Sequence, residues 1–280
     1  NIEDWLGNLA EEMQRTLRDI IRGVSAEASQ MSVQEISDRY CAQVALVGIQ
    51  VMWTLDATDA FVRTKQGEKN ALPNANKKVA GVLSTLTGMS AQELSKRDRT
   101  KIETLITIQV HQRDIFDDLV KKKVKEVTDF EWQKQMRYYW LHDTDTLSIS
   151  IADMDFDYSF EYLGCTERLV ITPLTDRCYI TLSQALGLYL GGAPAGPAGT
   201  GKTETTKDMG RALGKFVVVF NCSDQFDYRG MGKIFKGLCQ SGCWGCFDEF
   251  NRIELEVLSV VAQQVLSILT AMRERRKTFV

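Results

Sequence analysis

One glycine-rich stretch constrains the fold of this chain more than any other feature. Residues 191–203 read GGAPAGPAGTGKT, and the eight residues from Gly196 to Thr203 match the pattern G-x-x-x-x-G-K-[ST]. In such a loop the glycines let successive backbone N–H groups point into one concavity, and the helix that follows places its positive end there. The pattern therefore predicts a phosphate-binding loop (P-loop) that leads into a helix starting at Lys202 and ending near Gly214.

The residue types in this loop assign chemical roles. Lys202 offers a positive charge to the β- and γ-phosphates of a nucleotide, and Thr203 offers a hydroxyl to Mg²⁺. The candidate nucleotide-binding residues of this segment are Gly196, Pro197, Ala198, Gly199, Thr200, Gly201, Lys202, Thr203 and Glu204.

A second candidate segment follows about 45 residues later. The short apolar run 243–247 reads CWGCF, which is typical of a buried strand, and it ends in Asp248 and Glu249. Asp248 is the expected Mg²⁺ partner, and Glu249 is the expected base that orients and deprotonates an attacking water. We expect the two carboxylates to do separate work because successive strand residues point to opposite sides. Without the P-loop, Asp248 would be read as the cap of the next helix.

Two other motifs compete with this interpretation. The spacing of Cys239, Cys243 and Cys246 is one that iron–sulfur enzymes use, but Cys246 falls inside the expected strand, where a small apolar side chain suffices. Residues 227–230 (DYRG) resemble the D-x-x-G element of GTPases, yet they precede the acid-ended strand and no N-K-x-D signature follows the P-loop. Adenine is therefore the expected base.

The first 140 or so residues have the three-and-four apolar spacing of successive helices, which predicts a bundle or a curved helical rod. Capping-box patterns occur at Ser32 with Glu35, at Ser90 with Glu93, and at Thr128 with Glu131. The polar stretch 65–78 is expected to connect two helices. Strand-like alternation begins at Thr146 and extends through the aromatic residues of 156–162.

Beyond this point, strand and helix patterns alternate, with an apolar run at 216–220 and a helix expected over about 254–275. This order favours a parallel α/β sheet. The predicted fold class is thus α plus α/β: a helical part over residues 1–155, followed by a P-loop NTPase sheet over 156–280 that lacks its C-terminal part.

Composition bears mainly on possible partners. The 280 residues are 44% hydrophobic and 25% charged with a net charge of −3, so the bulk charge gives no reason to expect nucleic acid or an anionic membrane as a partner. No signal peptide is expected, and the longest apolar run, near 44–53, is too short to span a bilayer. The other four cysteines, Cys41, Cys165, Cys178 and Cys222, are scattered without pairing spacing, which is typical of reduced intracellular thiols.

Four blocks of the second half together resemble the first AAA+ module of a dynein heavy chain. They are 169–179 (LVITPLTDRCY), 191–203, 220–223 (FNCS) and 244–252 (WGCFDEFNR). Residues 2–6 (IEDWL) and 160–164 (FEYLG) resemble the C-terminal end of the dynein linker, and residues 192–195, 204–206 and 223–225 are similar to axonemal, outer-arm chains.

This resemblance implies a segment of an ATP-driven, minus-end-directed microtubule motor, bound to ATP or ADP with Mg²⁺, whose linker swing drives ciliary beating. It implies that Val170, Ile171, Pro173 and Leu174 lie over adenine, and that Asn251 and Arg252 support the acidic pair or face a neighbouring module. The implied partners are the other AAA+ modules of the same chain, intermediate and light chains, and microtubules bound through parts beyond this sequence, in the cytoskeleton of cytoplasm and axoneme. The alternative is a AAA+ module that binds ATP without hydrolysing it, and the presence of Glu249 favours hydrolysis.

Overall fold

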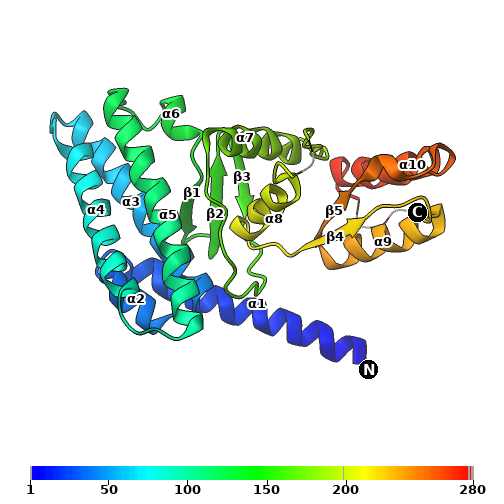
Figure 1. The fold of residues 1–280 in the computed structure, drawn as a ribbon, viewed down its shortest axis with the longest axis horizontal. Coiled ribbons are helices and arrows are strands. Elements are labelled where there is room, and N and C mark those ends of the chain that lie inside the picture. The colour runs from blue at the N-terminus through cyan, green and yellow to red at the C-terminus, as the bar shows by residue number, and fades with distance from the viewer. Residues whose placement is uncertain (1, 198, 277, 279–280) are drawn as a thin grey trace. The chain divides into compact units, whose positions relative to one another are not determined.

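A computed structural model describes residues 2–197, 199–276 and 278. The chain divides into two compact units between Asp176 and Arg177, and each is described by itself. Figure 1 labels the helices and strands of both units.

The first unit is mainly helical, as predicted. Its helices are α1 (Ile2–Glu27), α2 (Val33–Arg39), α3 (Ala42–Lys65), α4 (Ala71–Ser90), α5 (Lys96–Lys121) and α6 (Phe130–Gln133). Helix α3 is buried on every side over residues 42–54 and packs against α1, α4 and strand β1 (Arg137–Leu141), so it forms the centre of the unit. Its Trp53 lies against Phe116 and Trp132, with ring centroids 5.6 and 5.2 Å away.

The helix boundaries confirm one capping prediction and correct two. Ser32 caps α2 in a complete capping box with Glu35. Ser90 is instead the last residue of α4, and α5 begins after Ser95, whose hydroxyl accepts the N–H of Asp98. The short helix α6 is capped by Asp129 rather than by Thr128. A capping-box pattern signals a helix start only where the preceding backbone is extended, which the spacing alone does not reveal.

The polar stretch expected to connect helices over 65–78 is shorter than predicted. The connection ends at Asn70, and α4 begins at Ala71 with Pro73 in its first turn. Proline is tolerated there because the first N–H groups of a helix have no partner within the helix.

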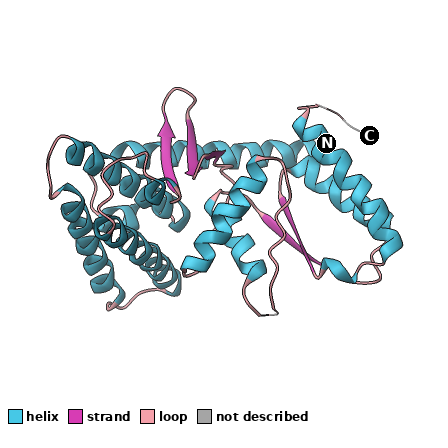
Figure 2. Ribbon diagram, turned by 90° about the horizontal axis from the view of Figure 1, so that it is seen from above, coloured by secondary structure: helices cyan, strands magenta, loops and turns pink. Residues whose placement is uncertain are grey.

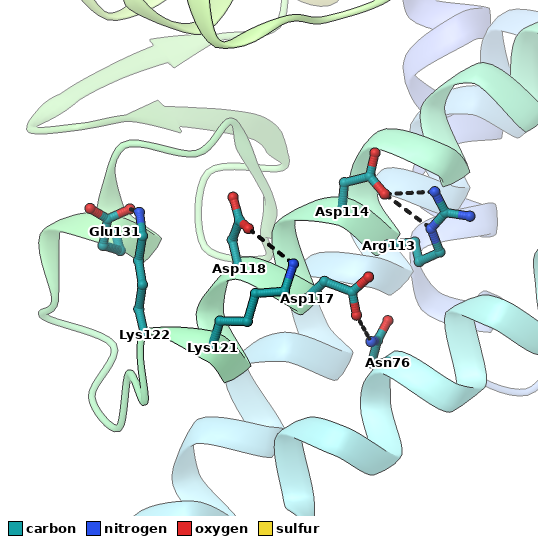
Figure 3. Close-up of polar contacts among 8 residues, drawn as sticks. All are labelled: Asn76, Arg113, Asp114, Asp117, Asp118, Lys121, Lys122 and Glu131. Carbon is teal, nitrogen blue, oxygen red and sulfur yellow. Dashed lines mark hydrogen bonds and ion pairs between the residues drawn. The ribbon is translucent and has the colours of Figure 1, made fainter.

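Ion pairs and hydrogen bonds border the C-terminal end of α5 (Figure 3). The Nδ2 of Asn76 on α4 donates to Oδ1 of Asp117 on α5, at 2.5 Å. Where α5 ends, Lys122 Nζ lies 2.7 Å from a carboxylate oxygen of Glu131, and Lys134 Nζ lies 2.7 Å from the same oxygen. Hydrogen bonds from Lys122 and Lys134 lower the pKa of the Glu131 carboxyl. The basic run 121–125 thus lies at a helix end, as predicted.

The helices of the first unit are followed by an antiparallel meander of three strands, β1 (Arg137–Leu141), β2 (Thr146–Ile151) and β3 (Met154–Asp157), in the order β1-β2-β3 (Figure 2). Strand β1 lies where the sequence predicted helix, because its apolar aromatic residues fit either period over so short a run. The alternating aromatics at 158–162 also depart from the prediction, since β3 ends at Asp157.

The second unit has the α/β order expected of it. Helix α7 (Pro173–Gly187) leads in and is followed by α8 (Lys202–Ala212), β4 (Val217–Asn221), α9 (Tyr228–Ser241), β5 (Trp244–Asp248), the 3₁₀ turn η1 (Phe250–Arg252) and α10 (Leu255–Arg273). Strands β4 and β5 pair in parallel, with Val219 opposite Cys246 and Asn221 opposite Asp248. Parallel pairing is therefore confirmed for this pair of strands, and both lie within one residue of their predicted positions.

Among the described residues, two helices are long and apolar enough to cross a membrane by length and composition alone, α3 and α10. Of the most apolar stretch of 18 residues in each helix, 78% is buried in α3 and 11% is buried in α10. The prediction from the sequence considered only uninterrupted apolar runs. Helix α10 is long and apolar enough on average, although glutamine and serine interrupt its apolar residues. Passing the test is weak evidence for a membrane span, because core helices of soluble proteins pass it too.

Candidate nucleotide site

The P-loop of the second unit has the backbone conformation that its glycines predict. Gly199 and Gly201 have φ values of +75° and +81°, in the left-handed region that residues with a side chain rarely adopt. Gly201 is the N-cap of α8, so the helix begins at Lys202 as predicted. Ala198 lies outside the described residues. The N-terminal N–H groups of α8 are thereby presented at the loop, where a helix favours an anion.

The charged end of Lys202 lies within the loop itself. Its Nζ donates to the carbonyl oxygens of Gly196 and Pro197, at 3.0 and 2.7 Å. The Thr200 hydroxyl donates to the carbonyl of Pro197 as well, at 2.9 Å. The loop carbonyls therefore hold the ammonium group beside the backbone that would surround a phosphate.

The structure brings together the two motifs that the sequence separates. Oγ1 of Thr203, in the first turn of α8, donates to Oδ2 of Asp248, the last residue of β5, at 3.0 Å. A threonine hydroxyl and a carboxylate at the carboxyl end of a parallel strand are oxygen ligands of the kind that Mg²⁺ prefers. The donor set thus fits the metal that the sequence predicted.

Glu249 follows Asp248, but the reason predicted for their separation is wrong. Strand β5 ends at Asp248, and Glu249 has a φ of +52°, so strand alternation does not direct the two side chains. The backbone N–H of Glu249 donates to Oδ1 of Asp248 at 3.0 Å. The Glu249 carboxylate is half exposed and lies 3.5 Å from Nε of Arg252. The left-handed turn at Glu249, rather than the alternation of side chains along a strand, therefore separates the two carboxylates: that of Asp248 contacts Thr203, and that of Glu249 contacts Arg252.

Three further features of this unit have structural explanations. Glu204 lies in the first turn of α8 and forms an ion pair with Lys207 at 2.7 Å, so its part in nucleotide binding stays a prediction. Asp227, the first residue of the D-x-x-G likeness, caps α9 by accepting the N–H of Gly230 at 2.7 Å. Burial raises the pKa of the Cys246 thiol within β5, which favours the protonated form.

The segment expected at adenine belongs to the first unit. Val170 is 69% exposed and Leu174 is 70% exposed. Pro173 is the first residue of α7, a position that suits its fixed φ, and the hydroxyl of Thr172 accepts the N–H of Thr175. Contact of Val170, Ile171, Pro173 and Leu174 with adenine stays a prediction.

One buried hydrogen bond of this unit, between Tyr179 on α7 and Asp208 on α8, was not predicted, although Tyr179 is the last residue of the block 169–179. They are 29 residues apart and belong to no spacing motif. For Asp208 the available signal was an acidic residue in the middle of an expected helix, which is ordinary on an exposed face.

Taken together, a P-loop at the start of a helix, a parallel strand pair and an acidic pair where a strand ends define a P-loop nucleotide-binding module. Residues 158–280 match the family described as the hydrolytic ATP-binding site of the dynein motor region. That family is one of ATPases. The predicted boundary between residues 155 and 156 stays a prediction.

The chain belongs to the dynein heavy chains. It is 58% identical over 281 aligned residues to human dynein axonemal heavy chain 8, an alignment that covers 100% of this chain and 6% of that protein. It is 57% identical to the dynein gamma chain of the flagellar outer arm of Chlamydomonas reinhardtii, again over 100% of this chain and 6% of the relative. Identity to the ciliary dynein beta chain of Tripneustes gratilla is 50%, over 99% of this chain and 6% of the relative. The chain thus spans about 6% of the length of these relatives.

Proposed function

We propose that this chain binds and hydrolyses ATP as a segment of an axonemal dynein heavy chain. The observation that carries the proposal is the hydrogen bond from Thr203 to Asp248, because it joins the phosphate-binding helix to the strand that ends in the acidic pair. Two motifs 45 residues apart thereby form a single site within one compact unit.

Each residue of the site has a distinct task in this proposal. The backbone N–H groups of the P-loop and the start of α8 bind the phosphates of ATP, and Lys202 leaves the loop carbonyls to neutralise the β- and γ-phosphates. Thr203 and Asp248 hold Mg²⁺, which supplies electrostatic stabilisation of the phosphate charge. Glu249 orients the attacking water and accepts its proton.

Hydrolysis is favoured over binding alone by the chemistry of Glu249. A carboxylate one residue beyond the Mg²⁺ partner can take a proton from water, whereas a module that only binds nucleotide has no use for it. Its half-exposed side chain is also free to approach a substrate once the exposed ion pair with Arg252 separates.

The wider role rests on the relatives. They are axonemal, ciliary and flagellar proteins by name, so the chain acts in the axoneme, as part of the cytoskeleton. In this proposal residues 1–155 form the end of the linker, which couples hydrolysis in the second unit to a swing along a microtubule. The other AAA+ modules, the intermediate and light chains and the microtubule contacts belong to this wider proposal.

The test is the turnover of ATP by the heavy chain that contains these residues. Glu249→Gln should reduce kcat at least about a hundredfold while ATP still binds, because an amide cannot accept the proton. Lys202→Ala should instead weaken ATP binding itself. Glu256→Gln, at an exposed position of α10, is the matched control for loss of a nearby carboxylate. Full turnover by the Glu249→Gln protein would overturn the hydrolytic assignment and leave the binding-only alternative.

A further inference from the structure

Two exposed thiols of the first unit lie beside one contact between distant segments. Cys41 is the N-cap of α3 and precedes Gln43 by two residues. Cys165 follows Leu163 by two residues, and Oε1 of the buried Gln43 accepts the N–H of Leu163 at 2.8 Å. Both cysteines are free and exposed. The contact therefore holds two accessible thiols on neighbouring stretches of the chain.

Helix α5 borders both of these stretches. Nζ of Lys101 donates to the carbonyl oxygen of Ser37 in the last turn of α2, four residues before Cys41. Three residues further along α5, which is about 4.5 Å, Thr104 forms a hydrogen bond with the Cys165 thiol. Two neighbouring positions of one helix thus contact the stretch just before Cys41 and the side chain of Cys165.

The electrostatic surroundings of the two sulfurs differ. Burial raises the pKa of the Cys165 thiol, and a charge on Cys41 raises it further. The Lys101 ammonium and the hydrogen bond with Thr104 act in the opposite direction. Cys41 instead lies at the N-terminus of a helix of 24 residues, whose positive end favours a negative charge. Cys41 is therefore the thiol expected to react first, and Cys165 its neighbour is expected to react second.

We propose that Cys41 and Cys165 form a redox-sensitive pair, which a peroxide converts into a reversible disulfide between the start of α3 and the segment after β3. Disulfides of intracellular proteins are usually transient and redox-sensing. A small oxidant reaches both thiols, and the bond joins the same two segments that Gln43 joins by hydrogen bonding. The disulfide is thus a covalent and reversible form of a contact that the fold already makes.

The reaction balances with a peroxide as the oxidant. The Cys41 thiolate attacks one oxygen of hydrogen peroxide, the O–O bond breaks, and the departing hydroxide takes up a proton and leaves as water. The Cys165 thiolate then attacks the sulfur of the Cys41 sulfenic acid, so that the S–S bond forms, the S–O bond breaks and a second water leaves. The two thiols lose two protons and two electrons in total, and one peroxide is reduced to two waters.

The test uses the heavy chain that contains these residues. It is treated with hydrogen peroxide, the remaining thiols are blocked with N-ethylmaleimide, and disulfides are mapped by mass spectrometry without reduction. We expect the peptide that joins Cys41 to Cys165 to be the main disulfide product of the first unit, and dithiothreitol to remove it. Absence of this peptide would show that the two Cα atoms stay further apart than the roughly 7 Å that a disulfide spans, and would overturn the proposal.

Hydrogen exchange measures the structural effect of the bond. Exchange of the Leu163 amide should slow at least about tenfold in the oxidised protein, because a cross-link two residues away restrains local opening of this segment. An unchanged exchange rate in the cross-linked protein would overturn the proposed restraint.

Serine variants identify the thiol that reacts first. Cys165→Ser should leave Cys41 as a sulfenic acid that dimedone traps, whereas Cys41→Ser should leave Cys165 as a thiol. Cys239→Ser removes an exposed thiol on α9 of the second unit, so it is the matched control and should change neither the cross-link nor the exchange at Leu163. Pairing of Cys41 with any other cysteine in the unaltered protein would overturn the assignment of the pair.

Discussion

Replacing Gln43 by leucine tests whether one buried side chain holds the end of the first unit in place. Gln43 lies near the start of α3 and is 6% exposed. Its Nε2 donates to the Tyr158 hydroxyl and to the carbonyl of Glu161, and its Oε1 accepts the N–H of Leu163, each at 2.8 Å. One amide thus binds a segment more than a hundred residues away, just after β3.

The magnitude follows from those three contacts. Leucine has a similar size but no polar atoms, so all three hydrogen bonds are lost. At about 1 kcal/mol net for each bond, with more where a group stays buried and unpaired, the free energy of unfolding should fall by roughly 2–4 kcal/mol. Part of that cost is relieved where water reaches the backbone of Glu161 and Leu163, which are only partly buried.

Gln50 supplies a matched control on the same helix. It is 8% exposed and lies seven residues, about two turns, further along α3. Its Nε2 donates only within its own helix, to the carbonyl of Leu46 at 3.2 Å. Gln50→Leu should therefore cost less than about 1 kcal/mol, since it breaks no contact between distant segments.

Amide hydrogen exchange at Leu163 is the most direct assay, because it reports local opening even where the two units unfold separately. Gln43→Leu should lower the protection of this amide strongly, and Gln50→Leu should leave it nearly unchanged. Urea unfolding followed by the fluorescence of the core tryptophans gives the stability of the first unit as a whole. Equal protection of the Leu163 amide in the two variants would refute the reasoning.

Two further perturbations act on single residues. Burial raises the pKa of Tyr158 to about 12 from 10.0, so the folded state holds its proton more tightly than the unfolded state does. Stability should therefore fall by about 2 kcal/mol as the pH rises from 10 to 12, and Tyr158→Phe should remove that part of the alkaline slope in unfolding titrations. Gly210→Ala should destabilise the second unit by about 1–3 kcal/mol in urea unfolding, because the added Cβ collides with Val217. Gly81→Ala, in an exposed part of α4 with no atom within 4 Å of the added Cβ, should instead stabilise by about 0.5–1 kcal/mol; destabilisation by both alanines would show that packing at β4 is not the cause.

Local patterns account for the parts of the fold that the sequence predicted. The start of α8 after the P-loop, the strand that ends in Asp248 and the helix near the C-terminus each depend on neighbouring residues: a glycine with positive φ, an apolar run, or a repeated helical spacing. Dependence on neighbouring residues alone also explains why two of the predicted helix caps were wrong. Ser90 and Glu93 have the spacing of a cap, but the Ser90 hydroxyl donates to the carbonyl of Thr87 inside α4, and nothing in the spacing excludes this.

The contacts between distant polar residues could not have been predicted in this way. Gln43 and Tyr158 are 115 residues apart, and Tyr179 and Asp208 are 29 apart. Polar residues in expected helices are read as exposed, because most of them are. Which of them is buried depends on the packing of whole elements, so the pairing becomes visible only with the tertiary structure.

The backbone at the acidic pair determines which substitution is a clean test of catalysis. Glu249 adopts a left-handed conformation that costs a residue with a side chain about 1 kcal/mol or more, and that conformation directs its N–H to Oδ1 of Asp248. Glycine would relieve this strain, and it would change the turn after β5 at the same time as it removed the carboxylate. Glutamine keeps the Cβ, the length of the side chain and the left-handed turn, so the Asp248 carboxylate keeps its hydrogen bonds from the Glu249 N–H and the Thr203 hydroxyl. A loss of turnover in Glu249→Gln would therefore measure the loss of the proposed base, whereas a loss in Glu249→Gly would combine it with a displacement of Asp248, the proposed magnesium ligand.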